Sequence, residues 1–304
     1  MELLQQKLDH IGVRTQRDLL LAKHSTFAIG GHAKLAVFPK TQEELLQTLE
    51  VANAYTKPLL IGKGSNVVFS DEGFDGVVIF TTDFREAVVS ENQIEASAGY
   101  SLIALSNLAR EKGLSGLEFS CGIPGTLGGA VYMNAGAFGG NMAQICVRST
   151  CHDAKSNRVF TLCGEEQAFG VRTSIYANHS NYTVLGATLL LRADDRSAID
   201  ERMKEYKARR LKTQPQGLPN AGSVFKHPVG YFAGKLIQDC GLKGYSIGGA
   251  QVSDVHAGFI VNRGGATGAD VRSLVEHIRA CVLREYGVEL ECEIRFIPQS
   301  PTLL

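Results

Sequence analysis

Apolar and polar positions alternate with two different periods along the first 80 residues. The apolar residues between 45 and 52 recur at the spacing of one helix face, and Thr41 with Glu44 forms a capping-box pattern just before them. Short apolar runs surround this helix and predict strands at 34–39, 58–61, 67–69 and 76–80. The pattern therefore predicts a small β-α-β-β unit with a loop, residues 62–66, at the carboxyl end of a strand.

A second block of elements begins near residue 81. Ser101 opens a helical pattern that Gly113 ends. Strand patterns fall at 94–98, 145–151, 158–162 and 183–192. This block carries the β-rich part of the chain.

The last third of the chain begins with a charged helical pattern, Ala198–Leu211, followed by a Pro/Gly-rich loop at 214–219. Two further helices are predicted at 233–240 and 268–286, and two strands at 258–262 and 289–297. We therefore expect three domains, at 1–80, 81–208 and 209–304, with the third an α+β domain of its own.

Glycine marks two loops. The segment Cys121–Gly140 contains many glycines and Pro124, so we expect neither an ordinary helix nor an ordinary strand there, while its apolar residues argue against a polar linker. The shorter loop 62–66 is either a plain βα turn or a phosphate cradle. It fits neither the nucleotide-hydrolase spacing G-x-x-x-x-G-K-[ST] nor the dinucleotide spacing G-x-G-x-x-G. Two such loops favour one large cofactor held at two places.

Composition excludes several classes of protein. Among 304 residues, 44% are hydrophobic and 20% charged, and 31 basic residues balance 31 acidic ones, so no electrostatic case for nucleic-acid binding arises. No apolar run approaches the ~20 residues of a membrane span, and the polar N-terminal stretch lacks a secretory signal. We expect a cytoplasmic protein with seven reduced cysteines, no metal site and no obligate protein partner.

Six motifs then occur in a fixed order. They are Gly62-Lys-Gly-Ser-Asn66, Ile123-Pro-Gly-Thr-Leu-Gly-Gly129, Met133-Asn-Ala-Gly-Ala137, Ala221-Gly-Ser-Val-Phe-Lys226, Leu242-Lys-Gly244 and Ile247-Gly-Gly-Ala250. Together they resemble the family of UDP-N-acetylenolpyruvoylglucosamine reductases, flavoenzymes of bacterial peptidoglycan precursor synthesis, from about residue 26 to residue 297. The short gap after Tyr176 resembles the second type of this family, which lacks a tyrosine-bearing insertion.

The resemblance implies an α+β fold. Two subdomains of the kind found in vanillyl-alcohol oxidase relatives would bind FAD non-covalently, and a C-terminal α+β domain would bind the substrate. The implied FAD contacts are Gly62, Lys63, Gly64, Ser65, Asn66, Ile123, Pro124, Gly128, Gly129, Asn134 and Gly136.

The resemblance also implies catalytic residues. Arg172, Ser223 and Glu293 occupy the matching positions, although the alignment alone separates Glu293 from Glu291. Weaker candidates for binding the substrate are Lys212, Lys226, Lys243 and His256. Val171 and His227 depart from the residues common in the family, a tyrosine and an asparagine.

The implied reaction uses NADPH to reduce UDP-N-acetylglucosamine enolpyruvate to UDP-N-acetylmuramate. Hydride transfer to the enolpyruvyl group builds negative charge toward its carboxylate, which a cation such as Arg172 and a protonated Glu293 would stabilise. The Ser223 hydroxyl would then deliver a proton to C2. The alternatives are an oxygen-using flavin oxidase and a flavin-binding protein without turnover.

Overall fold

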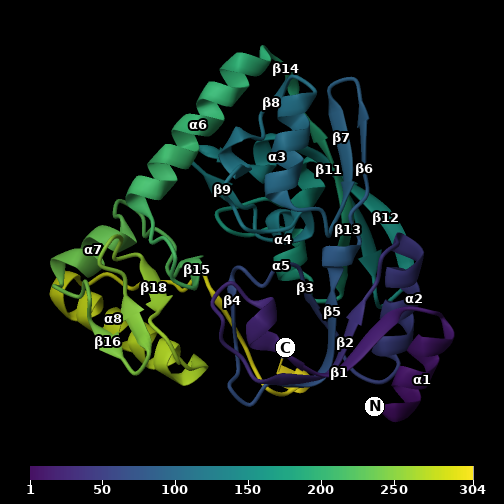
Figure 1. The fold of residues 1–304 in the computed structure, drawn as a ribbon, viewed down its shortest axis with the longest axis horizontal. Helices are drawn as coiled ribbons and strands as arrows, with labels where there is room; N and C mark the ends of the chain where they lie inside the picture. The colour runs from purple at the N-terminus through teal and green to yellow at the C-terminus, as the bar shows by residue number, and fades with distance from the viewer. Residues whose placement is uncertain (304) are drawn as a thin grey trace. The chain divides into compact units, whose positions relative to one another are not determined.

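The computed structural model describes residues 1–303 and is drawn in Figure 1. Its contacts divide the chain into two compact units. Unit 1 comprises Met1–Arg17, Leu35–Lys63 and Val77–Arg210, and unit 2 comprises Asp18–Lys34, Gly64–Gly76 and Leu211–Leu304. The three-domain division expected from the sequence stays a prediction.

The first 83 residues build two helices and a four-stranded sheet with the order β1-β2-β5-β3. The elements are α1 (Glu2–His10), β1 (Arg14–Leu20), β2 (His32–Phe38), α2 (Gln42–Asn53), β3 (Leu59–Ile61), β4 (Val67–Phe69) and β5 (Phe74–Phe80). The predicted helix cap is confirmed, because the Thr41 side chain accepts a hydrogen bond from the Glu44 backbone N–H at 3.1 Å.

The rest of unit 1 is organised around a five-stranded antiparallel sheet with the order β12-β11-β13-β7-β6. Its elements are β6 (Ala87–Ser90), β7 (Gln93–Ser97), α3 (Leu102–Glu111), β8 (Leu114–Ser115), α4 (Leu127–Tyr132), β9 (Gly136–Ala137), β10 (Gly140–Asn141), β11 (Cys146–Asp153), β12 (Arg158–Cys163), α5 (Ile175–Asn178), β13 (Tyr182–Leu190), β14 (Arg192–Ala193) and α6 (Arg196–Thr213). Leu105 of α3 and Val131 of α4 share one buried cluster with Ile94 and Leu189 of the sheet, and Figure 1 shows the two helices beside these strands.

Unit 2 contains a four-stranded antiparallel sheet with the order β15-β18-β17-β16 and a parallel pair, β19-β4. Its further elements are β15 (Asn220–Ser223), α7 (Ala233–Asp239), β16 (Ser246–Ile247), β17 (Ala250–Val252), β18 (Phe259–Asn262), α8 (Gly268–Tyr286) and β19 (Arg295–Ile297). The helices predicted at 233–240 and 268–286 are thus confirmed as α7 and α8.

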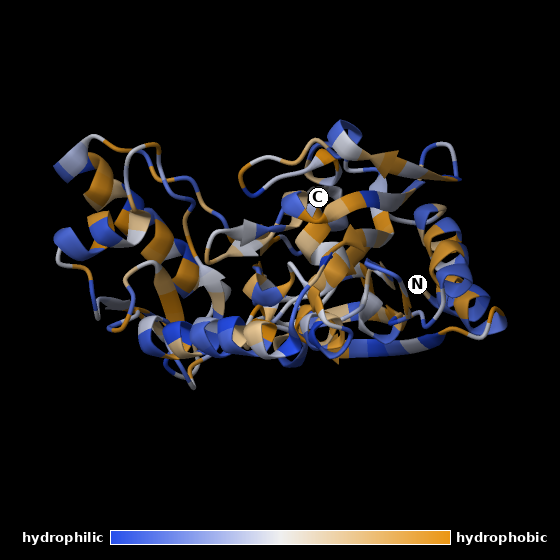
Figure 2. Cartoon of the chain, turned by 90° about the horizontal axis from the view of Figure 1, so that it is seen from above, coloured by the Kyte–Doolittle hydropathy of each residue, from blue (hydrophilic) through white to orange (hydrophobic). Residues whose placement is uncertain are grey.

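Apolar side chains of both units are buried where helices meet sheets. In unit 2, Ile237 of α7 and Ile278 of α8 are fully buried together with Val252 of β17. Burial of one such side chain contributes roughly 1.5–3 kcal/mol. Figure 2 shows orange and blue residues alternating along the helices, as expected for elements with one apolar face.

Two expectations from the sequence were wrong. The glycine-rich segment contains a short helix, α4. Burial of Leu127, Ala130 and Val131 on one side stabilises this helix, although its glycines lower the local helix propensity. The strand predicted at 289–297 is reduced to β19, which begins only at Arg295. Upstream of it the backbone makes a single bridge, between Phe225 and Cys292, so Glu291 and Glu293 do not lie in one strand.

Candidate active site

The two glycine segments meet within unit 1. A side-chain carbon at Gly62 would lie 2.2 Å from the Thr126 hydroxyl, so only glycine lets the first loop approach the second segment. Pro124 and Gly129, on either side of Thr126, are exposed. Outside the backbone of its own helix and its chain neighbours, a side-chain carbon at Gly129 would have only the Thr126 hydroxyl within 4 Å. The segments therefore come together and keep accessible backbone, as a shared flavin site requires.

Other glycines of this region allow neighbouring segments of backbone to pack closely. A side-chain carbon at Gly128 would lie 2.8 Å from that of Ala98, and the Gly128 N–H donates to the Ala98 carbonyl at 2.8 Å. At Gly136 the nearest atom would be the Gly140 carbonyl oxygen, at 2.6 Å. Gly128 and Gly136 thus have a structural reason to be glycine, and their contact with FAD stays a prediction.

Arg172 lies at the tip of a tight turn in unit 1. Its backbone is left-handed, with φ 55°, between Gly170 and Thr173, which bridge each other. The guanidinium donates to the Gly136 carbonyl at 3.1 Å, and the Asn134 amide donates to the Gly170 carbonyl at 2.9 Å. The glycine-rich segment therefore fixes the position of Arg172.

Asn134 also accepts a hydrogen bond from the Ala143 N–H at 2.9 Å, so both ends of its amide bind protein backbone. Its contact with the cofactor stays a prediction. Ile123 is half-buried, while Lys63 is exposed at the edge of the first loop.

Ser223 ends β15 in unit 2 and is half-buried. Gly222, with φ 79°, shifts the pairing register with β18 just before Ser223, which then lies opposite Phe259. The next residue, Val224, donates its N–H to the Gly258 carbonyl at 2.9 Å. The irregular strand end thus holds the Ser223 backbone in one orientation.

Glu293 belongs to the same local structure. Its N–H donates to the Val224 carbonyl at 2.7 Å, one residue beyond Ser223. The structure therefore brings together two of the three predicted catalytic residues, although 70 positions separate them in the sequence.

Glu291 has a different environment. Its carboxylate is 72% exposed and pairs with the Lys226 ammonium at 2.6 Å. Glu293, by contrast, is half-buried, and this difference in exposure distinguishes the two residues, a distinction that the sequence could not make. The ion pair also shows that Lys226, a predicted substrate contact, already has an ionic partner.

The remaining substrate candidates lie in different settings. Lys212 and Lys243 are exposed. His256 accepts a hydrogen bond from the Gly258 N–H at 3.0 Å through Nδ1, and burial lowers its pKa below the ordinary value. His256 is therefore neutral with its proton on Nε2, a hydrogen-bond donor rather than a cation.

Comparisons with known proteins identify the family. The family described as "UDP-N-acetylenolpyruvoylglucosamine reductase, C-terminal domain" matches residues 214–297, and that described as "FAD binding domain" matches residues 33–161. The UDP-N-acetylenolpyruvoylglucosamine reductase of Clostridium perfringens is 41% identical over 281 residues, 92% of each chain. That of Listeria innocua is 42% identical over 302 residues, 99% of this chain and 100% of the relative.

The chain belongs to the UDP-N-acetylenolpyruvoylglucosamine reductase family. The crystal structure of the reductase from Thermus caldophilus agrees, with a TM-score of 0.80, 35% identity, and coverage of 94% of this chain and 100% of that one. The predicted α+β fold, with an FAD-binding region followed by a C-terminal reductase domain, is confirmed. Within residues 1–303, no helix is long and apolar enough to cross a membrane.

Arg210 lies against the glycine-rich segment, and the sequence did not single it out as a residue of the site. A side-chain carbon at Gly122 would lie 2.6 Å from Arg210 Nε, and the guanidinium lies 5.9 Å from the Phe138 ring centroid. Phe138 in turn stacks on Tyr206 of α6 at 4.8 Å. The charged helix alone gave no signal that selects Arg210 among its other basic residues.

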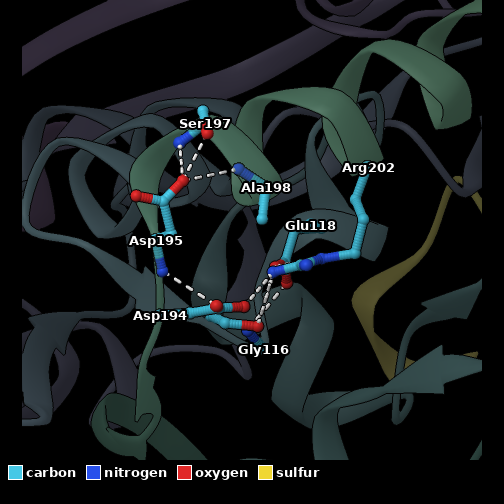
Figure 3. A network of polar contacts seen from close by, with 8 residues as sticks. Gly116, Glu118, Asp194, Asp195, Ser197, Ala198 and Arg202 are labelled. Carbon is cyan, nitrogen blue, oxygen red and sulfur yellow. Dashed lines mark hydrogen bonds and ion pairs between the residues drawn. The ribbon is translucent and has the colours of Figure 1, made fainter.

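A network of charges fixes the start of α6 (Figure 3). Arg202 donates to Glu118 at 2.8 Å and to Asp194 at 2.5 Å, and Glu118 also accepts from the Gly116 N–H at 2.7 Å. Burial raises the pKa of Glu118, but hydrogen bonds from backbone N–H groups, Arg202 and Ser115 outweigh it and hold the pKa below its ordinary value.

Replacing Glu118 with glutamine is expected to lower the free energy of unfolding by roughly 1–3 kcal/mol near neutral pH, because a charge-assisted network loses its anion. The pKa of Glu118 is lower in the folded state than in the unfolded state. The stabilisation that the Glu118 carboxylate gives the wild-type protein is therefore lost as the pH falls below about 4 and through the folded-state pKa. Urea unfolding of both proteins at neutral and acid pH measures this. Glu285→Gln, at an exposed pair with Arg284, is the matched control. A difference between Glu118→Gln and wild type that persists at acid pH would contradict the electrostatic explanation.

Proposed function

We propose that this protein catalyses the NADPH-dependent reduction of UDP-N-acetylglucosamine enolpyruvate to UDP-N-acetylmuramate in peptidoglycan precursor synthesis. Family membership over nearly the whole chain supports the reaction. One observation connects this reaction to particular residues. The Glu293 N–H donates a 2.7 Å hydrogen bond to the carbonyl of Val224, the residue that follows Ser223. We also propose a cytoplasmic site of action for this reaction.

The residues present fit FAD. The two glycine segments approach each other at Gly62 and Thr126, and the Gly64 backbone adopts φ 60°, a conformation that exposes N–H groups in turns. The loop 62–66 and the backbone around Pro124 and Gly129 would hold the diphosphate. Bound FAD would take up hydride from NADPH and supply it to the C3 carbon of the enolpyruvyl group.

The chain's own residues would then control charge and protons. We assign to Arg172 the stabilisation of negative charge on the substrate carboxylate, since a guanidinium is a cation with several hydrogen-bond donors. Glu293, in its protonated form, would donate a hydrogen bond to the same group. The Ser223 hydroxyl would deliver the proton to C2, so that hydride and proton together saturate the double bond.

The assignments for substrate binding differ in strength. Lys243 and Lys212 are exposed and suit a diphosphate through charge. His256 would contribute an Nε2–H donor. Lys226 would have to exchange Glu291 for a phosphate, so its contribution depends on substrate replacing the 2.6 Å ion pair.

Anaerobic rapid mixing tests the function. The protein is reduced with NADPH and then mixed with the enolpyruvyl substrate in the absence of oxygen. Flavin reoxidation by substrate is expected. Reoxidation that requires oxygen would instead identify a flavin oxidase, and no reduction by NADPH would identify a flavin-binding protein without turnover.

A further inference from the structure

We infer that Asn66 is a positioning residue that holds the Glu293 backbone through its side-chain amide. The inference rests on the proposed function, in which Glu293 acts on the substrate carboxylate. It assigns to Asn66 a role distinct from the predicted contact between its backbone and the cofactor diphosphate.

The evidence is a pair of hydrogen bonds in unit 2. Asn66 Nδ2 donates to the Glu293 carbonyl oxygen at 3.1 Å, and the Asn66 carbonyl accepts from the Arg295 N–H at 3.0 Å. Asn66 thus hydrogen-bonds both Glu293 and Arg295. The contact with Glu293 joins positions 227 residues apart in the sequence, at the end of the first glycine loop.

The Glu293 backbone depends on these contacts because no strand includes it. The parallel pairing of β4 with β19 begins at Val67 and Arg295, so it stops just short of Glu293. On the other side, the Glu293 N–H is bound to Val224 at 2.7 Å. The peptide groups on both sides of the Glu293 Cα are therefore fixed. The Val224 carbonyl binds the N–H of the preceding peptide group, and the Asn66 amide binds the carbonyl of the following one.

The consequence is geometric coupling between the glycine loop and the catalytic carboxyl. Catalytic groups lose about 10²-fold in rate for displacements near 1 Å. An amide that holds the Glu293 carbonyl would set the orientation of the side chain without touching substrate. Asn66 would consequently affect the step that uses Glu293 more strongly than the reduction of the flavin by NADPH.

The test measures three quantities for Asn66→Ala: the dissociation constant of FAD, the rate of anaerobic reduction by NADPH, and the rate of reoxidation by the enolpyruvyl substrate. Reoxidation is expected to slow about tenfold to hundredfold, by analogy with other losses of positioning. The slowing of reoxidation should exceed any loss of FAD affinity or of reduction rate by about tenfold or more. Asn66→Leu, which has a similar size but no hydrogen-bond donor and no charge, should reproduce the slowing if the alanine variant is unstable.

A double-mutant cycle shows whether Asn66 acts through Glu293. In a Glu293→Ala background, adding Asn66→Ala should slow reoxidation by less than about twofold, because two residues acting through one group are not additive. Asn181→Ala serves as the control, since this amide donates to Asp153 in unit 1. The control should match wild type in both half-reactions.

Three results would overturn the inference, and they are distinguishable. Full additivity with Glu293→Ala would show that Asn66 acts elsewhere. Equal slowing of both half-reactions with loss of FAD would make Asn66 only a cofactor contact. Normal reoxidation in Glu293→Ala alone would remove Glu293 from the proposed mechanism, and the inference about Asn66 would fall with it.

Discussion

Replacement of Ser223 with alanine is expected to leave the reduction of the flavin by NADPH nearly unchanged and to slow its reoxidation by the enolpyruvyl substrate. The reason is that hydride uptake needs no proton from this residue, whereas saturation of C2 does. General acid catalysis contributes roughly 10²–10⁴-fold, so a loss of that order is expected in the second half-reaction alone. Stopped-flow measurement of the two half-reactions under anaerobic conditions gives both rates.

Substrate affinity should change little in this variant, because one hydroxyl is a small part of a site for a large UDP-sugar. Ser273→Ala, on an exposed face of α8, is the matched control for the loss of a hydroxyl in unit 2. Equal slowing of both half-reactions would instead indicate a displaced flavin. Unchanged turnover would remove Ser223 from the mechanism.

Replacement of Gly64 with valine is expected to abolish most FAD binding. The residue has φ 60°, which a β-branched side chain strongly resists, and a side-chain carbon there would lie 2.4 Å from the His24 carbonyl oxygen. The Gly64 carbonyl also accepts the Thr26 N–H at 3.2 Å, so the loop cannot shift without losing that bond. Backbone strain of this kind costs on the order of 1–3 kcal/mol before the steric clash is added.

The flavin content of the purified variant, read from its visible absorbance, measures the effect. Gly217→Val separates the two causes, because Gly217 has a similar φ of 73° but nothing within 4 Å of an added side-chain carbon. We expect Gly217→Val to lose some stability and to keep its FAD. Full flavin occupancy in Gly64→Val would show that the loop does not hold the cofactor.

Periodicity and motif order were sufficient for much of this protein. The helices α2, α7 and α8 follow from apolar residues that repeat on one face, since each helix packs that face onto a sheet. The ordered motifs were sufficient to identify the reductase family and its FAD-binding region, which the comparisons confirm. Both signals are local or collinear with the chain, and a sequence records such signals directly.

Contacts between distant segments determined what the sequence left open. Burial against the sheet made α4 a helix within a glycine-rich segment, where local propensity opposed it. Exposure separated Glu291, whose carboxylate is 72% exposed, from the half-buried Glu293, which spacing alone treated alike. The amide of Asn66 turned toward a carbonyl 227 positions away, at a residue that the sequence assigned only to the cofactor loop. The sequence by itself determined which residue types are available for the site. Only the tertiary structure decided which of them bind one another, because a hydrogen bond depends on distance in space and not on separation along the chain.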